Sequence, residues 1–99
     1  MIRHCVLLRF VDDATPDQRR AVLDELATLP GAIPEIEAYR FGDDVGLADG
    51  NWDLGVTGDF ADAAAYAVYA GHEAHIRVIA ERIKPILADR AAVQFEFEA

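Results

Sequence analysis

The chain has 99 residues, enough for one hydrophobic core and hence for a single domain spanning residues 1–99. Its formal net charge of −9 argues against a nucleic-acid partner and against an anionic membrane surface, because both require a basic face on the protein. Apolar residues make up 53% of this small chain, and this excess favours burial between two copies in a homodimer.

The sequence predicts neither a membrane segment nor a disulfide. No stretch approaches the roughly 20 apolar residues of a membrane span. The opening MIRHCVLLRF is too short and too interrupted by Arg3, His4 and Arg9 to act as a signal peptide. Cys5 is the only cysteine, and we interpret it as a small buried apolar residue. We therefore expect a cytoplasmic protein.

The first half of the chain predicts a strand, a helix and a second strand. Residues 2–10 alternate like a strand, with His4 and Val6 on one face and Cys5 and Leu7 on the other. The T-P-D-Q sequence at 15–18 is typical of a capping box, and it predicts a helix over 16–28 that Pro-Gly at 30–31 ends. Residues 35–42 follow a proline and predict the second strand.

The second half predicts a loop, a strand, two helices and a last strand. Gly and Asp dominate the loop 43–51, and a short strand follows at 52–60. An alanine-rich helix comes next, with Asp59 or Asp62 near its start, and Gly71 interrupts it. The following helix closes near Pro85. Its predicted apolar face comprises Ile76, Ile79, Ile83 and Ile86. Residues 91–99 alternate as a final strand.

The order β-α-β-β-α-α-β predicts an α+β sandwich of ferredoxin-like type, with helices on one face of the sheet. The other face would stay open. We expect it to hold Cys5, Leu7 and Tyr39, with Arg3, Arg9, Glu96 and Glu98 around them. Two such sheets packed face to face would bury this surface and close a dimeric α/β barrel.

Five segments together resemble the stress-responsive α/β-barrel domain family: MIRHCVLLRF, IPEIEAYRFGDDV, WDLGVTGDF, GHEAH before IRVIAERIKPIL, and VQFEF. The resemblance covers essentially the whole chain and implies the same dimeric fold. Two departures bear on activity. Glu73 stands where the family commonly has the proline of H-P-x-H, and Leu54 stands where it often has a strand histidine.

The resemblance also implies a candidate chemistry. Most members have no established reaction, but plant polyketide cyclases of this fold close a ring by an aldol condensation without metal or organic cofactor. Their working groups correspond to His4, Tyr69 and His75 of this chain. His75 would then abstract a proton, while Tyr69 and His4 would donate hydrogen bonds to the developing enolate oxygen.

The His72–His75 pair admits three interpretations. A zinc site of H-E-x-x-H type needs its second histidine at position 76, where Ile76 stands, although a pair three apart can still touch one ion. As acid/base groups, the histidines would face an apolar cavity that favours neutral imidazoles. We expect Val6, His72 and Ile79 to line that cavity. In the structural interpretation, the histidines cap or bond the backbone.

The leading hypothesis is a dimer that binds a small apolar or phenolic ligand and performs cofactor-free acid/base chemistry, as a polyketide cyclase or a related lyase or isomerase. The alternative is a non-catalytic stress-response protein that binds a ligand or a partner. A cofactor-independent monooxygenase is the third option. A cavity around His75 smaller than about 300 Å³ would favour the structural interpretation, because most small-molecule sites are larger.

Overall fold

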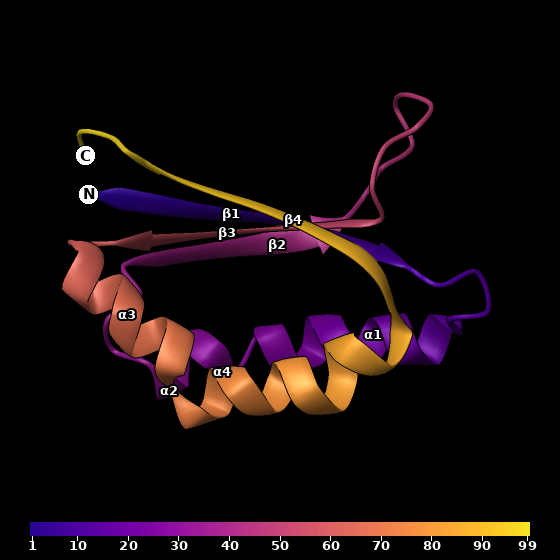
Figure 1. The fold of residues 1–99 in the computed structure, drawn as a ribbon, viewed down its shortest axis with the longest axis horizontal. Helices are drawn as coiled ribbons and strands as arrows, with labels where there is room; N and C mark the ends of the chain where they lie inside the picture. Colours follow the sequence, from indigo (N-terminus) through magenta and orange to yellow (C-terminus); the bar gives the residue numbers. More distant parts are fainter.

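A computed structural model describes residues 1–99 and shows a four-stranded sheet with helices on one face (Figure 1). The strands are β1 (Ile2–Phe10), β2 (Ala38–Asp43), β3 (Leu54–Phe60) and β4 (Leu87–Glu96). Their order is β2-β3-β1-β4, and all neighbours are antiparallel. The helices are α1 (Pro16–Leu26), α2 (Leu29–Ala32), α3 (Ala63–Gly71) and α4 (Glu73–Val78), the last continuing through a π-helical turn η1 (Ile79–Ile83) and a 3-10 turn η2 (Lys84–Ile86). This is the predicted ferredoxin-like α+β fold.

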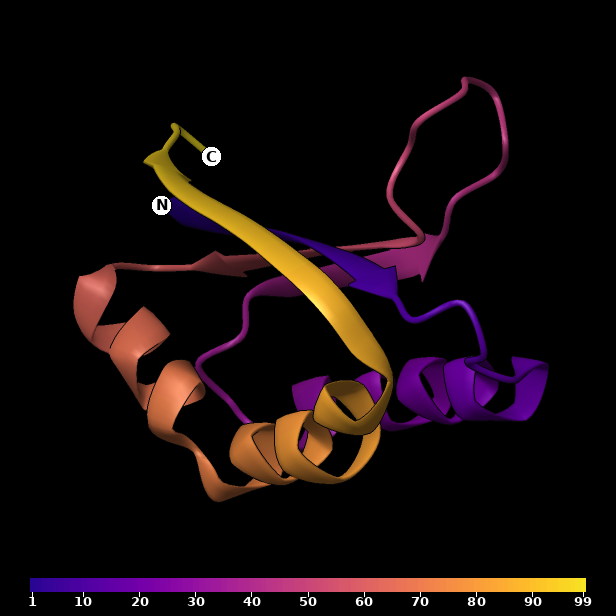
Figure 2. The ribbon, with the colours of Figure 1, turned by 45° about the vertical axis from the view of Figure 1, so that its right-hand side comes forward.

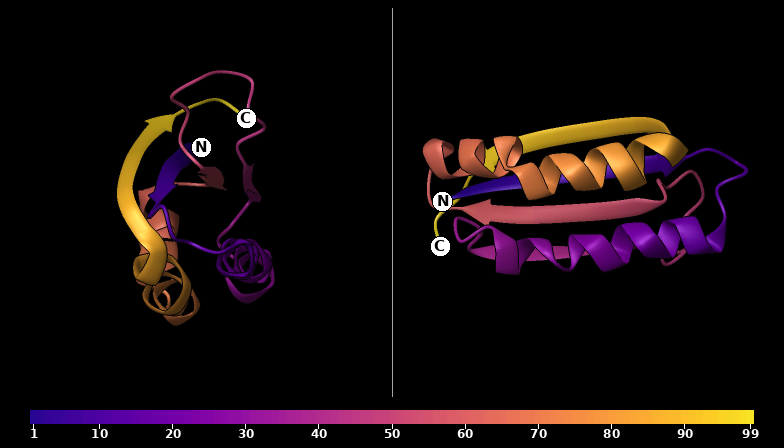
Figure 3. Two further views of the ribbon diagram at one scale, coloured as in Figure 1. Left: turned by 90° about the vertical axis from the view of Figure 1, so that its right-hand side faces the viewer. Right: turned by 90° about the horizontal axis from the view of Figure 1, so that it is seen from below.

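The core lies between the sheet and the helices. The side chains of β1 alternate between the two faces of the sheet as predicted. His4, Leu8 and Phe10 are buried on the helix-covered face, whereas Leu7 and Arg9 are exposed on the other. Seen from below, α1 and the α3–α4 run lie side by side along the strands (Figure 3). The largest fully buried side chains are Phe60, Leu29, Ile33, Leu54 and Val22. No helix is long and apolar enough to cross a bilayer.

The capping box predicted for the first helix is present, but the predicted end of the helix is wrong. The Thr15 hydroxyl accepts from the Gln18 backbone N–H at 3.1 Å, and the Gln18 side chain accepts from the Thr15 N–H at 2.8 Å. Helix α1 ends at Leu26, and Pro-Gly at 30–31 lies inside α2 instead of terminating a helix. Proline is tolerated there because the first turn of a helix needs no backbone donor.

In the second half the structure decides one open alternative and moves two predicted boundaries. Asp62 alone caps α3, accepting from the Ala65 N–H at 2.9 Å, because Asp59 is engaged by Arg3 through contacts of 2.7 and 2.9 Å. Gly71 is the last residue of α3, so the interruption of the helix falls at His72 and not at Gly71. Strand β4 begins at Leu87, four residues before the predicted start, because the turn η2 that contains Pro85 ends at residue 86.

Three of the four residues predicted for the apolar face of the last helical run, Ile79, Ile83 and Ile86, lie in or against the core, but Val78 replaces Ile76. Ile76 is 52% exposed, while Val78, Ile83 and Ile86 are buried. The replacement arises because the helix begins only at Glu73 and changes to π-helical winding after Val78, so a constant 100° step does not describe it.

Two residues predicted for the open face lie elsewhere. Tyr39 is opposite Gly58, which is itself opposite His4, so Tyr39 shares the helix-covered face. Gly58 makes room for the ring, since an added Cβ would lie 3.2 Å from Tyr39 Cδ1. Glu96 is opposite Ile2, and Phe95 is opposite Arg3. The apolar residues of the open face on β1 and β4 are Cys5, Leu7, Ala91, Val93 and Phe95.

The open face is apolar and bordered by a projecting loop. Leu7, Val93 and Phe95 are 44%, 57% and 46% exposed. The loop between β2 and β3 rises on this side of the sheet, away from the helices (Figures 1 and 2). Its Val45 and Leu47 are 78% and 88% exposed. Single exposed apolar residues are ordinary, but a cluster of them on one sheet face marks a surface suited to association.

Candidate active site

The corner between α3 and α4 brings two ring-bearing side chains together. His72 ends α3 with extended backbone, and its Nδ1 accepts from the Ala74 N–H at 3.0 Å to begin α4. The turn places Tyr69, in the last turn of α3, against His75, in the first turn of α4. Their ring centroids are 4.2 Å apart. The sequence YAGHEAH therefore folds into one wall of a site, and His72 is the residue at which the chain turns from α3 into α4.

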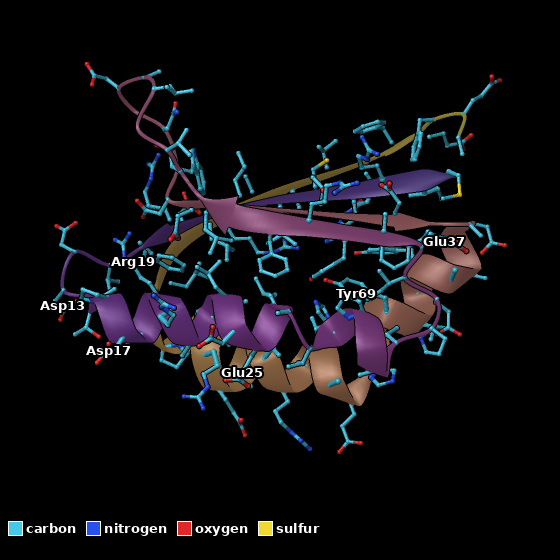
Figure 4. All side chains as sticks on the ribbon, turned by 180° about the vertical axis from the view of Figure 1, so that it is seen from behind. Asp13, Asp17, Arg19, Glu25, Glu37 and Tyr69 are labelled. Carbon is cyan, nitrogen blue, oxygen red and sulfur yellow. The ribbon has the colours of Figure 1, made fainter.

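A small cavity opens beside this wall, between the sheet and the α4–η1 run. Its volume is about 140 Å³, and eight of its fourteen lining residues are aliphatic. The polar or titratable groups that line it are His4, Tyr39, Tyr69, His75, Lys84 and Arg90. Figure 4 shows Tyr69 in the layer between sheet and helices. The volume resembles that of an engineered protein cavity of about 150 Å³ that admits benzene.

Two tyrosines form a hydrogen-bonded pair in this layer. The hydroxyls of Tyr39 and Tyr69 are 2.8 Å apart. Burial raises the pKa of Tyr39 beyond its ordinary range, and the bond to Tyr69 raises it further. Burial also raises the pKa of Tyr69, while the bond from Tyr39 acts to lower it. Either hydroxyl can donate in this bond, and the tyrosine that accepts keeps its own hydrogen for another acceptor.

The hydrogen bond of His75 defines its neutral tautomer. Its Nδ1 lies 3.1 Å from the backbone carbonyl oxygen of Ala70. A carbonyl can only accept, so Nδ1 carries the hydrogen and Nε2 carries the lone pair. Burial lowers the pKa of His75, the bond to Ala70 opposes that change, and the charge of Arg90 lowers the pKa further. His75 is therefore a neutral imidazole with a basic nitrogen at pH 7.

His4 has the complementary tautomer. The side-chain N–H of Gln94 donates to His4 Nδ1 at 2.7 Å, which leaves the hydrogen of the neutral ring on Nε2. The ring is only 3% exposed and packs on Tyr66, at 5.0 Å between centroids, and on Tyr69, at 6.1 Å. Burial, with help from the charges of Arg90 and His75, lowers the pKa of His4 to about 4.

The second nitrogens of both histidines reach accessible space. Neither has a hydrogen-bond partner within the protein, yet no fully buried side-chain nitrogen or oxygen lacks one. His4 and His75 both line the cavity. The site thus presents a hydrogen-bond donor at His4 and an acceptor at His75, with the phenolic hydroxyl of Tyr69 beside them.

The structure gathers five of the six residues predicted for the site. His4, Val6, Tyr69, His75 and Ile79 all line the cavity. The sixth prediction, that His72 lines it, is corrected: His72 is the cap of α4, and its Nδ1 is occupied by the Ala74 N–H. Sequence reasoning missed Tyr39, Gln94 and Arg90. Tyr39 had been placed on the wrong face, whereas Gln94 and Arg90 lie on a strand whose register only the sheet pairing reveals.

The two departures from the family pattern leave this site in place. Glu73 is the first residue of α4, where an acidic side chain suits the helix N-terminus as a proline would. Leu54 is 1% exposed in the core and does not line the cavity. The structure contains no group of three or more His, Cys, Asp or Glu side chains placed to hold a metal ion.

Comparison with known proteins agrees with this architecture. The sequence model of the stress responsive A/B barrel domain matches residues 2–97. A dimeric ferredoxin-like protein of unknown function from Thermobifida fusca is 46% identical, with a TM-score of 0.90, over 97% of this chain and 90% of that chain. A comparison with curated protein sequences finds no match.

Two more distant solved structures share the fold. An Arabidopsis thaliana protein is 20% identical, with a TM-score of 0.84, over 100% of this chain and 97% of its own. A hydroxynitrile lyase from Passiflora edulis is 15% identical, also with a TM-score of 0.84, over 98% of this chain and 93% of its own. At these identities the likeness shows the fold alone. The match across residues 2–97 shows more: the chain belongs to the stress responsive A/B barrel domain family.

Proposed function

We propose that the cavity performs cofactor-free proton transfer of lyase or isomerase type on a small substrate. The observation that supports this most is the pairing of tautomers around one apolar cavity, with a basic nitrogen on His75 and a hydrogen donor on His4. Such a set can remove a proton while it stabilises the negative charge that develops on a substrate oxygen.

Each residue would have a defined part in this step. His75 Nε2 accepts the proton and becomes an imidazolium, and the electrons left behind reside on the substrate oxygen. The Tyr69 O–H and the His4 Nε2–H donate hydrogen bonds to that oxygen. Tyr39 would be a positioning residue: in this step it donates the bond to the Tyr69 oxygen 2.8 Å away, and the Tyr69 hydrogen is left for the substrate. In an isomerase the proton then returns from His75 to another atom of the substrate. In a lyase the negative charge on the substrate oxygen forms a carbonyl as the bond to the leaving group breaks, and the leaving group takes the proton from His75.

The cavity volume selects among the chemistries that use this step. About 140 Å³ accommodates roughly one aromatic ring, which is far less than a linear poly-β-keto chain. We therefore favour a small lyase or isomerase substrate over ring closure of a long chain. The hydroxynitrile lyase from Passiflora edulis, which shares the fold, is consistent with lyase chemistry on this scaffold.

The cofactor-independent monooxygenase and the cytoplasmic location stay predictions.

The second candidate function is binding without catalysis. One observation favours it: the cavity is smaller than the approximately 300–1,000 Å³ of most small-molecule sites. In this case the histidines hold the α3–α4 corner and the end of β1, and any ligand is bound unchanged. The two functions differ in whether His75 exchanges protons with a bound compound.

The direct test is proton exchange, which requires no knowledge of the natural substrate. Small ketones of about one ring would be incubated with the protein in D₂O, and exchange of the hydrogens on the carbon next to the carbonyl would be followed by NMR. His75→Gln should slow the catalysed exchange by about 10²–10⁴, the usual worth of a positioned base. His72→Asn is the matched control, since Asn keeps the helix cap and removes an imidazole outside the cavity. Equal exchange rates in folded wild type and His75→Gln would refute the proposal.

We also propose that two copies pack through their open sheet faces. The exposed apolar residues Leu7, Val93 and Phe95, together with the β2–β3 loop on the same side, support a face-to-face sandwich. The Thermobifida fusca relative is dimeric. In sedimentation, wild type should have twice the 10.9 kDa chain mass, and Leu7→Glu should shift it to monomer. Ile76→Glu, on an equally exposed residue of α4, should not; a monomeric wild type would contradict the proposal.

A further inference from the structure

The cavity carries two positive charges and no negative one. Lys84, from η2, and Arg90, from β4, are among its lining residues, and both are exposed at its rim. None of the fourteen lining residues is Asp or Glu. The chain as a whole has 18 acidic residues against nine Lys and Arg, so this rim has a sign opposite to that of the rest of the protein.

Neither cation is neutralised by the protein itself. Four other arginines have carboxylate partners: Arg3, Arg19, Arg77 and Arg82. Lys84 and Arg90 have no carboxylate within 4.0 Å in the structure. The nearest acidic neighbour in sequence is Asp89, whose side chain accepts from the Arg90 backbone N–H at 2.8 Å. In the strand register Asp89 lies opposite Arg9 of β1. The Arg90 guanidinium is therefore available to a ligand.

Arg90 lies close to the proposed acid/base groups. Its register partner on β1 is Leu8, on the helix-covered face, four residues from His4. Its charge lowers the pKa of His4, of His75 and of Tyr69, so all three lie within its field. A guanidinium in this place can hold an anionic oxygen group through two parallel N–H bonds, which an ammonium cannot.

We propose that the cavity's ligand is a small monoanion, whose apolar body of about one ring enters the cavity while its carboxylate, or a comparable anionic group, is held by Arg90 with support from Lys84. This names the substrate class for the proposed acid/base function and rests on that function. It also gives a reason for a cationic rim on an acidic protein: a free anion is repelled by the net charge of −9 unless the site supplies a local attraction.

Benzoate and benzamide provide a matched pair of probes, similar in shape and different in charge. Binding would be followed by the NMR signals of His75 and Tyr69 at pH 7. Benzoate should bind about tenfold more tightly than benzamide, the usual worth of a charged hydrogen bond. Arg90→Gln should remove that advantage and leave benzamide binding unchanged. Arg20→Gln, which removes the same charge from the exposed face of α1, should preserve it.

The outcomes separate this inference from the function on which it rests. Equal affinity for benzoate and benzamide, or equal loss in Arg90→Gln and Arg20→Gln, would overturn the anionic ligand and leave the acid/base proposal standing. If neither compound moves the His75 signal, the cavity takes no small ligand and both proposals fail. Should Arg90→Gln not fold, two measurements replace it. Lys84→Gln should weaken benzoate binding and leave benzamide binding unchanged, and added salt should do the same to wild type. Benzoate binding that neither change weakens would overturn the inference.

Discussion

Acidification should destabilise this protein through His4, because the folded state holds that imidazole neutral. Its pKa is about 4 when folded, against about 6.5 in an unfolded chain. In the window between these values the unfolded chain binds more protons, so the free energy of unfolding falls as the pH falls. At pH 4.5 unfolded His4 is almost entirely protonated and folded His4 is mostly neutral. The resulting loss between pH 7 and pH 4.5 is about 2 kcal/mol.

Urea unfolding at pH 7 and pH 4.5, at one fixed protein concentration, measures this loss. In His4→Gln the difference between the two pH values should be smaller than in wild type by about 2 kcal/mol. Comparing each variant with itself at pH 7 cancels the packing lost in the substitution. Asp59 does not interfere, because its bond to Arg3 holds its pKa below the ordinary value and moves its contribution to lower pH.

His75 contributes in the same direction as His4, since burial lowers its pKa too. The reasoning about His4 would be refuted if His4→Gln and wild type lost equal stability on acidification. That result would mean that the ring is solvated and titrates normally, and it would remove the neutral donor from the proposed site.

Three further changes test the tyrosine pair and the helix that carries it. Tyr39→Phe removes the 2.8 Å bond to Tyr69 and should cost about 1 kcal/mol in urea unfolding; a stability equal to that of wild type would show that the bond contributes nothing. Gly58→Ala would place a Cβ 3.1 Å from Phe60 and 3.2 Å from Tyr39, so crowding should cost about 1–3 kcal/mol and alter the near-ultraviolet circular dichroism of the tyrosines. Asp62→Ala should lower the unfolding free energy by about 1 kcal/mol and Asp62→Asn by much less, since only the former loses the cap; equal losses would assign the effect to charge.

The sequence predicted the fold because its strongest signals are local. Alternation over residues 2–10 placed His4, Leu8 and Phe10 on the buried face, and the Thr15–Gln18 capping box fixed the start of α1. The element order then left few topologies open. Element ends were predicted less well, because Pro30 and Gly31 are compatible with a short helix as well as with a stop.

The site was predicted only in part, because half of it depends on pairing between distant segments. Tyr39 reaches Tyr69 because Gly58, on the intervening strand, leaves space for its ring. Gln94 reaches His4 because β4 pairs with β1 in a register that no local pattern in β4 specifies. The corner at His72 was misassigned for a related reason: a histidine that caps a helix and one that lines a cavity have the same helical spacing until the first helical residue is known.

The two cavity histidines are oriented as the proposed acid/base function requires. A histidine that only stabilises a fold can satisfy both ring nitrogens within the protein, as buried polar groups usually do. Here each ring uses one nitrogen in a hydrogen bond within the protein, His75 to the Ala70 carbonyl and His4 to the Gln94 amide. The second nitrogen of each ring stays accessible. The partners are of opposite kind, a carbonyl that must accept and an amide N–H that donates, so the remaining nitrogens are also of opposite kind. An apolar cavity with one fixed base and one fixed donor is suited to a substrate that loses a proton at one atom and gains charge at another.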